Sequence, residues 1–251
     1  MQKSLIPHTI HYIWLGGNPK SELIERCIKV CKEKLPDWTF IEWNEKNYDI
    51  KKSNYMQQAY EQKKYAFASD YARFDILYEH GGIYLDTDVE LLKDFPDFML
   101  ENKGFAGLES NNKIAPGLVF ACEPKNPLVK EILDAYTVEK FLNDDGSENQ
   151  KTVVEYVTEV FKKHGFRMDG SEQIIEGFHI YPSEYFCAYD FITREFSITP
   201  NTISIHHYAG TWLTPTEKIE RKIKDSLRKI IGNKQYRMLV NIKRKYWGIK
   251  K

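Results

Sequence analysis

The sequence predicts an α/β domain followed by a basic helical extension. Near the N-terminus, two short apolar runs of strand character flank an amphipathic helical segment, which is the order of a parallel βαβ unit. A third apolar run, at residues 83–85, follows a long helical segment and ends in an acidic triplet. Of the 251 residues, 42% are hydrophobic, which is enough for a sizeable core. We expect the domain to span residues 1–215 and the extension residues 216–251.

The first elements follow from apolar spacing and turn residues. Residues 10–15 read as a buried strand that a Gly-Gly-Asn-Pro turn ends. Ser21 is a suitable cap for a helix running to about Leu35, with its apolar side chains on one face. Residues 38–43 predict the second strand of the βαβ unit.

Helical and strand patterns alternate along the remainder of the chain. Further helices are expected at residues 54–79, with a break near Tyr65, and at 127–136 and 151–164. Further strands are expected at residues 83–85, 89–92, 104–109, 118–122 and 203–208. From Thr216 the chain predicts a basic helix with an apolar stripe formed by Ile219, Ile223, Leu227, Ile230 and Ile231.

The formal net charge is zero but unevenly distributed. Residues 216–251 hold 13 Lys/Arg and 3 Asp/Glu, a local charge of +10. Such asymmetry indicates an anionic partner, and we expect peripheral contact with an anionic membrane through this segment. A solvated helix packed on the domain is the alternative. No nucleic-acid-binding motif accompanies the basic residues, so we expect no nucleic-acid partner.

The cysteines and the N-terminal residues indicate the cellular compartment of the protein. The four cysteines form no CxxC pair, and the spacing of Cys27 and Cys31 favours packing on one helix face over a disulfide or metal site. The N-terminus lacks the apolar run of a signal peptide, and no stretch approaches the roughly 20 apolar residues of a membrane-spanning helix. We expect a cytoplasmic protein with reduced thiols, with peripheral attachment to the inner face of the plasma membrane as a further possibility.

The triplet Asp86-Thr87-Asp88 is the strongest candidate for chemistry. Carboxylates in D-x-D spacing along an extended segment project to one side and reach one hard cation together, for which Mg²⁺ and Mn²⁺ are suited. So short a motif also occurs as two solvated surface acids. However, this one follows Gly81-Gly82 and an apolar strand, at the place where an α/β fold opens its ligand crevice.

Three other sets of residues have a functional and a structural interpretation. Asp70 and Arg73 share a helix face and would either reach sugar hydroxyls together or form a surface ion pair. Trp14 ends the first strand, where its ring would stack on a nucleobase or belong to the core. His206 and His207 end the last strand. One of them would be a third metal ligand, because adjacent strand residues face opposite ways, or both are structural.

Together these segments resemble glycosyltransferase family 32, the "sugar-binding region containing DXD motif" group found among capsule and exopolysaccharide gene products. The resemblance is carried by IHYIWLGG (10–17), KYAFASDYARFDILYEHGGIYLDTDVE (64–90), IYPSEYF (180–186) and SIHHYAGTW (204–212). It covers residues 6–215, and the central block is also similar to the catalytic domain of the large clostridial glucosylating toxins. Thr211 stands where many relatives have Ser, and Ala188 stands where Pro is expected.

The resemblance implies a GT-A fold, which is Rossmann-like, with added C-terminal helices. It implies that Asp86, Asp88, Asp70 and Arg73 form the catalytic set, with Asp88 as the most direct metal ligand and His206 or His207 near the metal or diphosphate. It further implies a donor site of Ile13, Trp14, Ser69, Asp70, Arg73, Tyr84 and Asp86, closed by a loop containing Thr211 and Trp212.

The implied activity is transfer of a hexose from a nucleotide sugar, UDP-galactose or UDP-glucose, with retention of the anomeric configuration and with Mn²⁺ or Mg²⁺ as cofactor. The expected acceptor is a glycan in capsule or exopolysaccharide synthesis. A lipid-linked oligosaccharide is one such acceptor. A toxin-like effector that glycosylates a protein is one alternative. A sugar-nucleotide-binding module without turnover is another.

Overall fold

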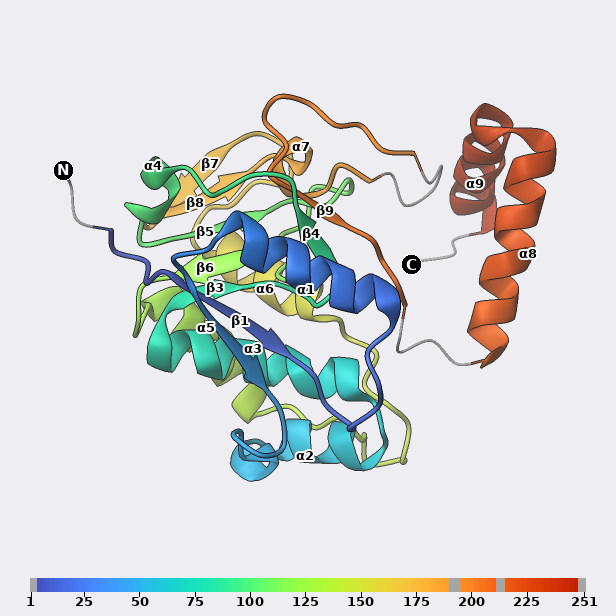
Figure 1. Ribbon diagram of the computed structural model, residues 1–251. Helices are drawn as coiled ribbons and strands as arrows, with labels where there is room; N and C mark the ends of the chain where they lie inside the picture. Colours follow the sequence, from blue (N-terminus) through green and yellow to red (C-terminus); the bar gives the residue numbers. More distant parts are fainter. Residues whose placement is uncertain (1–3, 190–194, 211–214, 248–251) are drawn as a thin grey trace. The chain divides into compact units, whose positions relative to one another are not determined.

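The computed structural model describes residues 4–189, 195–210 and 215–247, and its centre is a mixed β-sheet with helices on both faces (Figure 1). The sheet order is β2-β1-β3-β6-β5-β8-β7. These strands are β1 (Thr9–Ile13), β2 (Thr39–Trp43), β3 (Gly82–Tyr84), β5 (Gly104–Gly107), β6 (Phe120–Cys122), β7 (Gln173–Ile175) and β8 (Phe178–Tyr181). The predicted α/β class is confirmed.

The first three strands are parallel and include the βαβ unit that the sequence predicts; β5 and β8 also pair in parallel. β1 lies between β2 and β3 and runs parallel to both. The crossover from β1 to β2 is α1 (Glu22–Lys34), whose first turn is capped by the Ser21 side chain. This confirms the βαβ unit. By contrast, β6 is antiparallel to both of its neighbours and β7 is antiparallel to β8.

Alternating side chains of the sheet enter two hydrophobic cores. Tyr84 and Phe120 belong to one core and their neighbours Ile83 and Ala121 to the other, as the pleat requires. The first core is shared with α2 (Asn54–Glu61), α3 (Tyr65–His80), α5 (Pro127–Thr137) and α6 (Val153–Lys163). The second core is shared with α1, α4 (Asp97–Leu100), α7 (Ser183–Phe186) and the two-stranded sheet of β4 (Val89–Leu91) and β9 (Ser204–His206).

The helical segment before the acidic triplet breaks near Tyr65, as predicted, because Lys63 adopts φ 58° between α2 and α3. A short 3₁₀ helix, η1 (Ile50–Lys52), precedes α2. At its other end α3 stops at Gly81, which has φ 63°. Gly82 follows with φ 94°, and a Cβ there would lie 2.7 Å from the Thr9 carbonyl oxygen. Glycine at these positions therefore lets β3 begin directly beside β1.

The chain divides into two compact units, residues 1–188 with 198–209, and residues 189–197 with 210–251. The first unit contains the sheet. The second contains α8 (Pro215–Ile231), which is the predicted basic helix, and α9 (Asn233–Trp247), which the sequence analysis did not separate from it. Gly232, with φ 83°, stands between the two helices. Among the described helices, none combines the length and apolar character required to cross a membrane.

Candidate active site

The site is built at the edge of the sheet where the parallel strands β1 and β3 end. Trp14 follows β1 and Asp86 comes two residues after β3, so both belong to the carboxyl end of adjacent parallel strands. The Asp86 N–H donates to the Gly117 carbonyl oxygen at 3.1 Å, which fixes the backbone as it leaves the sheet. The chain then turns through Asp88 into β4. Because β4 pairs with β9 in antiparallel register, His206 is brought beside the acidic turn.

Asp86, Asp88 and His206 form a cluster of metal-ligand type. His206 Nε2 lies 3.0 Å from Asp88 Oδ1 and 3.8 Å from Asp86 Oδ2. One donor atom from each residue lies within 4.8 Å of the others. Among the described residues, buried His206 Nδ1 has no hydrogen-bond partner. Two carboxylates and an imidazole in this spacing fit a divalent cation such as Mn²⁺ or Mg²⁺.

Asp88 is held by the chain that follows β9. The His207 N–H donates to the Asp88 carbonyl oxygen at 3.0 Å, and the Ala209 N–H donates to Asp88 Oδ2 at 2.7 Å. Between them, Tyr208 adopts φ 48°, a left-handed conformation that is uncommon for a tyrosine. Such backbone strain concentrates at functional sites.

The electrostatics of the cluster favour an ionised Asp88 facing a charged His206. Burial would raise the pKa of Asp88, but the charge and hydrogen bond of His206 and the Ala209 N–H outweigh it and hold that pKa at about 2. Burial likewise would lower the pKa of His206, but its contact with Asp88 and the charge of Asp86 raise it above its ordinary value. The contact between Asp88 and His206 thus favours the charged form of each.

Arg73 of α3 connects the acid pair to the helix behind it. Its Nη2 lies 2.7 Å from Asp70 Oδ1 and 3.7 Å from Asp86 Oδ1, and it donates to Ser69 Oγ at 3.2 Å. The guanidinium carbon lies 4.7 Å from the centre of the Tyr84 ring. The Tyr84 hydroxyl in turn donates to Asp86 Oδ1 at 2.8 Å. The structure therefore brings together five of the predicted site residues in one network.

The Asp70–Arg73 pair is buried, not the surface ion pair that was the alternative interpretation. Asp70 is 8% exposed and Arg73 is 4% exposed. Burial raises the pKa of Asp70, although the adjacent guanidinium lowers it. Burial lowers the pKa of Arg73, but Tyr84, Asp70 and Asp86 raise it by more. The guanidinium therefore remains charged. A buried ion pair is costly and contributes little net stability, which favours a functional role for this one.

Gly117 was not predicted as a site residue. A Cβ at this position would lie 2.3 Å from Asp86 Oδ2, so only glycine allows the carboxylate its observed place. The Pro116-Gly117 dipeptide signals a turn in the sequence. Nothing local to it indicates that the turn would lie against Asp86, because that contact joins residues far apart in the chain. The Ala209 N–H was missed for the same reason.

Trp14 is partly exposed beyond the end of β1, while Ile13 is 8% exposed and belongs to the first core. The Trp14 indole N–H donates to the Asn18 carbonyl oxygen at 2.7 Å, and Lys20 Nζ lies 5.4 Å from the ring centre. The indole is thus held by its own turn beyond the carboxyl end of β1.

The structure separates the two histidines that the sequence presented together. His206 faces the acid pair, whereas His207 Nε2 lies 2.7 Å from Glu90 Oε2, in a different cluster. Their alternation at the end of β9 accounts for this difference. Thr211 and Trp212, expected in a loop over the donor, lie outside the described residues.

Comparison with known proteins finds similarity to glycosyltransferases over part of the chain. Residues 21–106 match the family described as "Glycosyltransferase sugar-binding region containing DXD motif". The chain is 30% identical over 159 residues to "Uncharacterized glycosyltransferase L373" of Acanthamoeba polyphaga mimivirus, an alignment covering 58% of this chain and 59% of that protein. It is 31% identical over 140 residues to "Inositol phosphoceramide mannosyltransferase 1" of Schizosaccharomyces pombe, covering 51% of this chain and 42% of that protein.

The chain also aligns with a solved structure at a TM-score of 0.47 and 12% identity. That structure is of a glycosyltransferase involved in the glycosylation of the major capsid of PBCV-1. The alignment covers 85% of this chain and 98% of that one. The chain spans less than two thirds of the length of the two sequence relatives. The matched region contains α3, β3 and the Asp86-Thr87-Asp88 turn. Residues 21–106 of this chain, which hold the D-x-D motif as Asp86-Thr87-Asp88, are thus similar to a glycosyltransferase sugar-binding region and lie within an α/β fold.

Proposed function

We propose that this chain is a metal-dependent, retaining glycosyltransferase that moves a hexose from a UDP-sugar, UDP-glucose or UDP-galactose, to a glycan acceptor. The observation that carries the proposal is the convergence of Asp86, Asp88 and His206 beside the buried Asp70–Arg73 pair. A family match supports the class of reaction, and the site supports the requirement for a cation. Capsule or exopolysaccharide synthesis is the proposed setting.

Each side chain has a role that follows from its contacts. Asp88 and Asp86, with His206, would hold Mn²⁺ or Mg²⁺. When bound, the cation supplies positive charge opposite the diphosphate of the donor. Arg73, fixed by Asp70, presents a permanent cation to the donor side of the site. Trp14 offers an aromatic face to the nucleobase at the neighbouring strand end. These groups are in place before the substrate binds, which is the arrangement that lowers a barrier most effectively.

Retention of configuration is proposed from the family and requires no protein nucleophile. In a front-side displacement, the leaving phosphate oxygen takes up the proton of the acceptor hydroxyl as the new glycosidic bond forms on the face from which the old one departs. The protein then contributes positioning and charge alone. The anomeric configuration of the product, measured by proton NMR of the disaccharide linkage, decides between retention and inversion.

The decisive experiment is a donor screen by nucleotide release. UDP-glucose and UDP-galactose are tested with Mn²⁺ and with Mg²⁺. GDP-mannose is included because one relative is named a mannosyltransferase. We expect turnover of a UDP-hexose that requires the cation. Asp88→Asn should abolish it, while Asp37→Asn, which alters an exposed acid before β2, should not. Donor binding without any nucleotide release would instead identify a sugar-nucleotide-binding module.

The basic helix α8 of the second unit suggests that the acceptor is bound at a membrane surface. The side chains of Ile219, Ile223, Leu227 and Ile230 follow one side of α8 and are 44–80% exposed, in a helix that also contains five described Lys or Arg side chains. An amphipathic basic helix of this kind fits an anionic lipid surface. The named substrate of the S. pombe relative, inositol phosphoceramide, is itself a lipid. We therefore propose a lipid-linked acceptor and a peripheral place on the inner face of the membrane.

Vesicle sedimentation tests this part separately. The full chain should sediment with vesicles of phosphatidylglycerol but not with vesicles of phosphatidylcholine alone. The double variant Ile223→Asp/Ile230→Asp should lose that binding and retain nucleotide release in solution. Ser226→Asp, which adds one negative charge to the same helix, is the control for charge. Equal sedimentation of the wild-type chain and the double variant would contradict membrane docking and leave the assignment of the reaction intact.

A further inference from the structure

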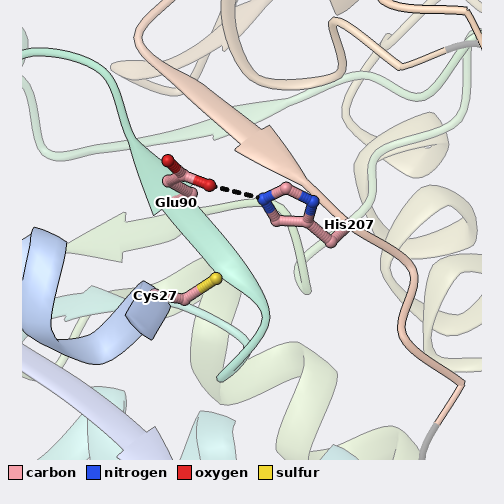
Figure 2. Close-up of side chains that lie close together, drawn as sticks. All are labelled: Cys27, Glu90 and His207. Atoms are coloured by element: carbon pink, nitrogen blue, oxygen red, sulfur yellow. Dashed lines mark hydrogen bonds and ion pairs between the residues drawn. The ribbon is translucent and has the colours of Figure 1, made fainter. Parts of the chain in front are cut away.

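A second cluster of cation ligands lies outside the active site. Figure 2 shows Cys27 of α1, Glu90 of β4 and His207, the residue after β9, converging from three elements that are distant in the sequence. One ligand atom of each lies within 4.8 Å of the others. His207 Nε2 lies 2.7 Å from Glu90 Oε2, and the Arg26 guanidinium lies 3.3 Å from the same oxygen. Neither of those contacts involves the thiol.

We propose that Cys27, Glu90 and His207 form a second divalent-cation site, selective for Zn²⁺-type ions over the Mg²⁺ and Mn²⁺ of the active site. A thiolate, an imidazole and a carboxylate with water in a fourth position form a tetrahedral ligand set that suits zinc. The acid pair and His206 supply harder donors. The two sites therefore differ in ligand chemistry although both lie beside the paired strands β4 and β9.

The spacing of the three ligands is compatible with one cation. Zinc bonds of about 2.3 Å to sulfur and about 2.0–2.2 Å to nitrogen and oxygen place tetrahedral ligands roughly 3.3–3.7 Å apart. The cluster is within 4.8 Å and needs only small side-chain shifts, in which the ring of His207 exchanges its contact with Glu90 for the cation. Glu90 is 24% exposed and His207 17%, which leaves a path for the ion and for a water ligand.

The negative charges of Glu90 and Asp88 near the thiol would attract a cation. Cys27 has no exposed surface. Burial, followed by the charges of Glu90 and Asp88, raises the pKa of this thiol to about 12, and only Arg26 among the named charges acts in the opposite direction. Without a cation the thiol is therefore protonated in an electronegative environment. On binding, the sulfur–metal bond forms as the S–H bond breaks, and the proton leaves to solvent.

A cation at this place would be structural. It would join α1 to β4 and to the chain after β9, at the residue next to His206. The backbone from which His206 reaches Asp88 would thereby be fixed from both sides. The expected readouts are metal affinity and thermal stability, not a change in the chemistry of the transferred sugar.

Cobalt spectroscopy on the full chain tests the proposal, because a Co²⁺–thiolate bond gives a near-ultraviolet charge-transfer band that oxygen and nitrogen ligands do not. We expect the band to appear with one equivalent of Co²⁺, to be removed by Zn²⁺ and to resist excess Mg²⁺. Cys27→Ala should lack the band. Cys31→Ala is the matched control, because it alters another buried cysteine of the same helix, one turn away, and should retain the band.

Two further variants show that loss of the band does not result from misfolding or from a change in the active site. Glu90→Gln changes a partly exposed residue and should weaken Co²⁺ binding at least tenfold, and it should remove a rise of a few degrees in Tm that Zn²⁺ gives the wild-type chain. Asp88→Asn should retain the charge-transfer band. Absence of the band from the wild-type chain, or its persistence in Cys27→Ala, would overturn the proposal. Either result would leave the nucleotide-release assay unaffected.

Discussion

Two clusters of ligands lie beside the paired strands β4 and β9 and differ in ligand chemistry and in the helix that packs against them. The first, Asp86 with Asp88 and His206, has hard donors and is supported by the buried Arg73. The second, Cys27 with Glu90 and His207, combines a thiol with a carboxylate and an imidazole, and its nearest guanidinium, that of Arg26, is more than half exposed. Asp88 and Glu90 are separated by one residue, and His206 and His207 are neighbours.

The difference shows how a short strand pair can serve two purposes. Successive residues at the end of β9 point to opposite sides, so His206 faces Asp86 and Asp88 and His207 faces Cys27 of α1. What distinguishes the two places is the element that covers each. The acid pair is backed by α3, with its buried ion pair, whereas Glu90 and His207 are backed by α1, with its thiol.

The largest expected effect separates the clusters by activity. Asp88→Asn removes a charged ligand and should reduce nucleotide release by about 10³-fold, because the charge that develops on the leaving diphosphate is no longer offset. Glu90→Gln, on the same strand, should retain most of the turnover. Both are measured by initial rates at saturating Mn²⁺. Equal losses in the two variants would remove the functional distinction between the clusters.

The next effect concerns stability and compares the two guanidinium groups. Arg73→Met leaves the buried carboxylate of Asp70 without its partner and should destabilise the fold by about 3–5 kcal/mol. Arg26→Met breaks a pair whose arginine is 57% exposed and should cost no more than about 1 kcal/mol. Urea unfolding of both variants provides the measurement. Similar midpoints would show that the Arg73 network contributes no more than a surface pair.

A smaller effect sharpens the role of the backbone in the first cluster. Gly117→Ala introduces a methyl group 2.3 Å from Asp86 Oδ2, so the carboxylate must move. We expect a destabilisation of about 1–3 kcal/mol and a weaker affinity for Mn²⁺, with the Co²⁺–thiolate band of the second cluster unchanged. Gly146→Ala is a control for backbone conformation alone, because Gly146 has φ 82° and open space around it. Unaltered Mn²⁺ binding in Gly117→Ala would contradict the role assigned to Gly117.

The smallest effect is a pH dependence. Asp88 and Asp86 raise the pKa of His206 above its ordinary value of 6.5, so the ring keeps its proton to higher pH than a free imidazole when no cation is bound. Because that proton must leave before the ring nitrogen binds a metal, Mn²⁺ affinity should rise about tenfold per pH unit below the raised pKa and level off above it. Calorimetric titrations at several pH values measure this. In His206→Gln the same titrations should lose the slope in this range, and an unchanged slope would assign the proton to another group.

Local patterns predicted most of the fold. The βαβ unit, the Ser21 cap and the break near Tyr65 depend on spacing and turn residues within a few positions, and the structure has all three. The sequence analysis did not predict the strands β7 and β8. It also did not predict the antiparallel direction of β6, because pairing direction depends on contacts between segments far apart in the chain. The separation of α8 from α9 was missed, although Gly232 offered a signal.

The sequence predicted the site about as completely as it predicted the fold. The acid pair and the Asp70–Arg73 spacing can be recognised in the sequence, since each lies within three residues. The burial of the ion pair, the approach of Gly117 and the partner of His207 could not be, because each depends on which element packs against it. In the same way, the spacing of Cys27 and Cys31 favoured simple packing, and only the register of β4 and β9 shows what lies opposite Cys27.

The composition of the second unit has a consequence for experiments on this chain. Residues 189–197 group with residues 210–251, so the backbone passes between the units after residues 188, 197 and 209. Within that unit the Asn233 amide contacts Glu195 at 2.5 Å. A truncation at residue 209 would therefore remove the Asn233 partner of Glu195 and is no clean removal of a tail. Residues 198–209, which include His206, are connected at both ends of the chain segment to the second unit.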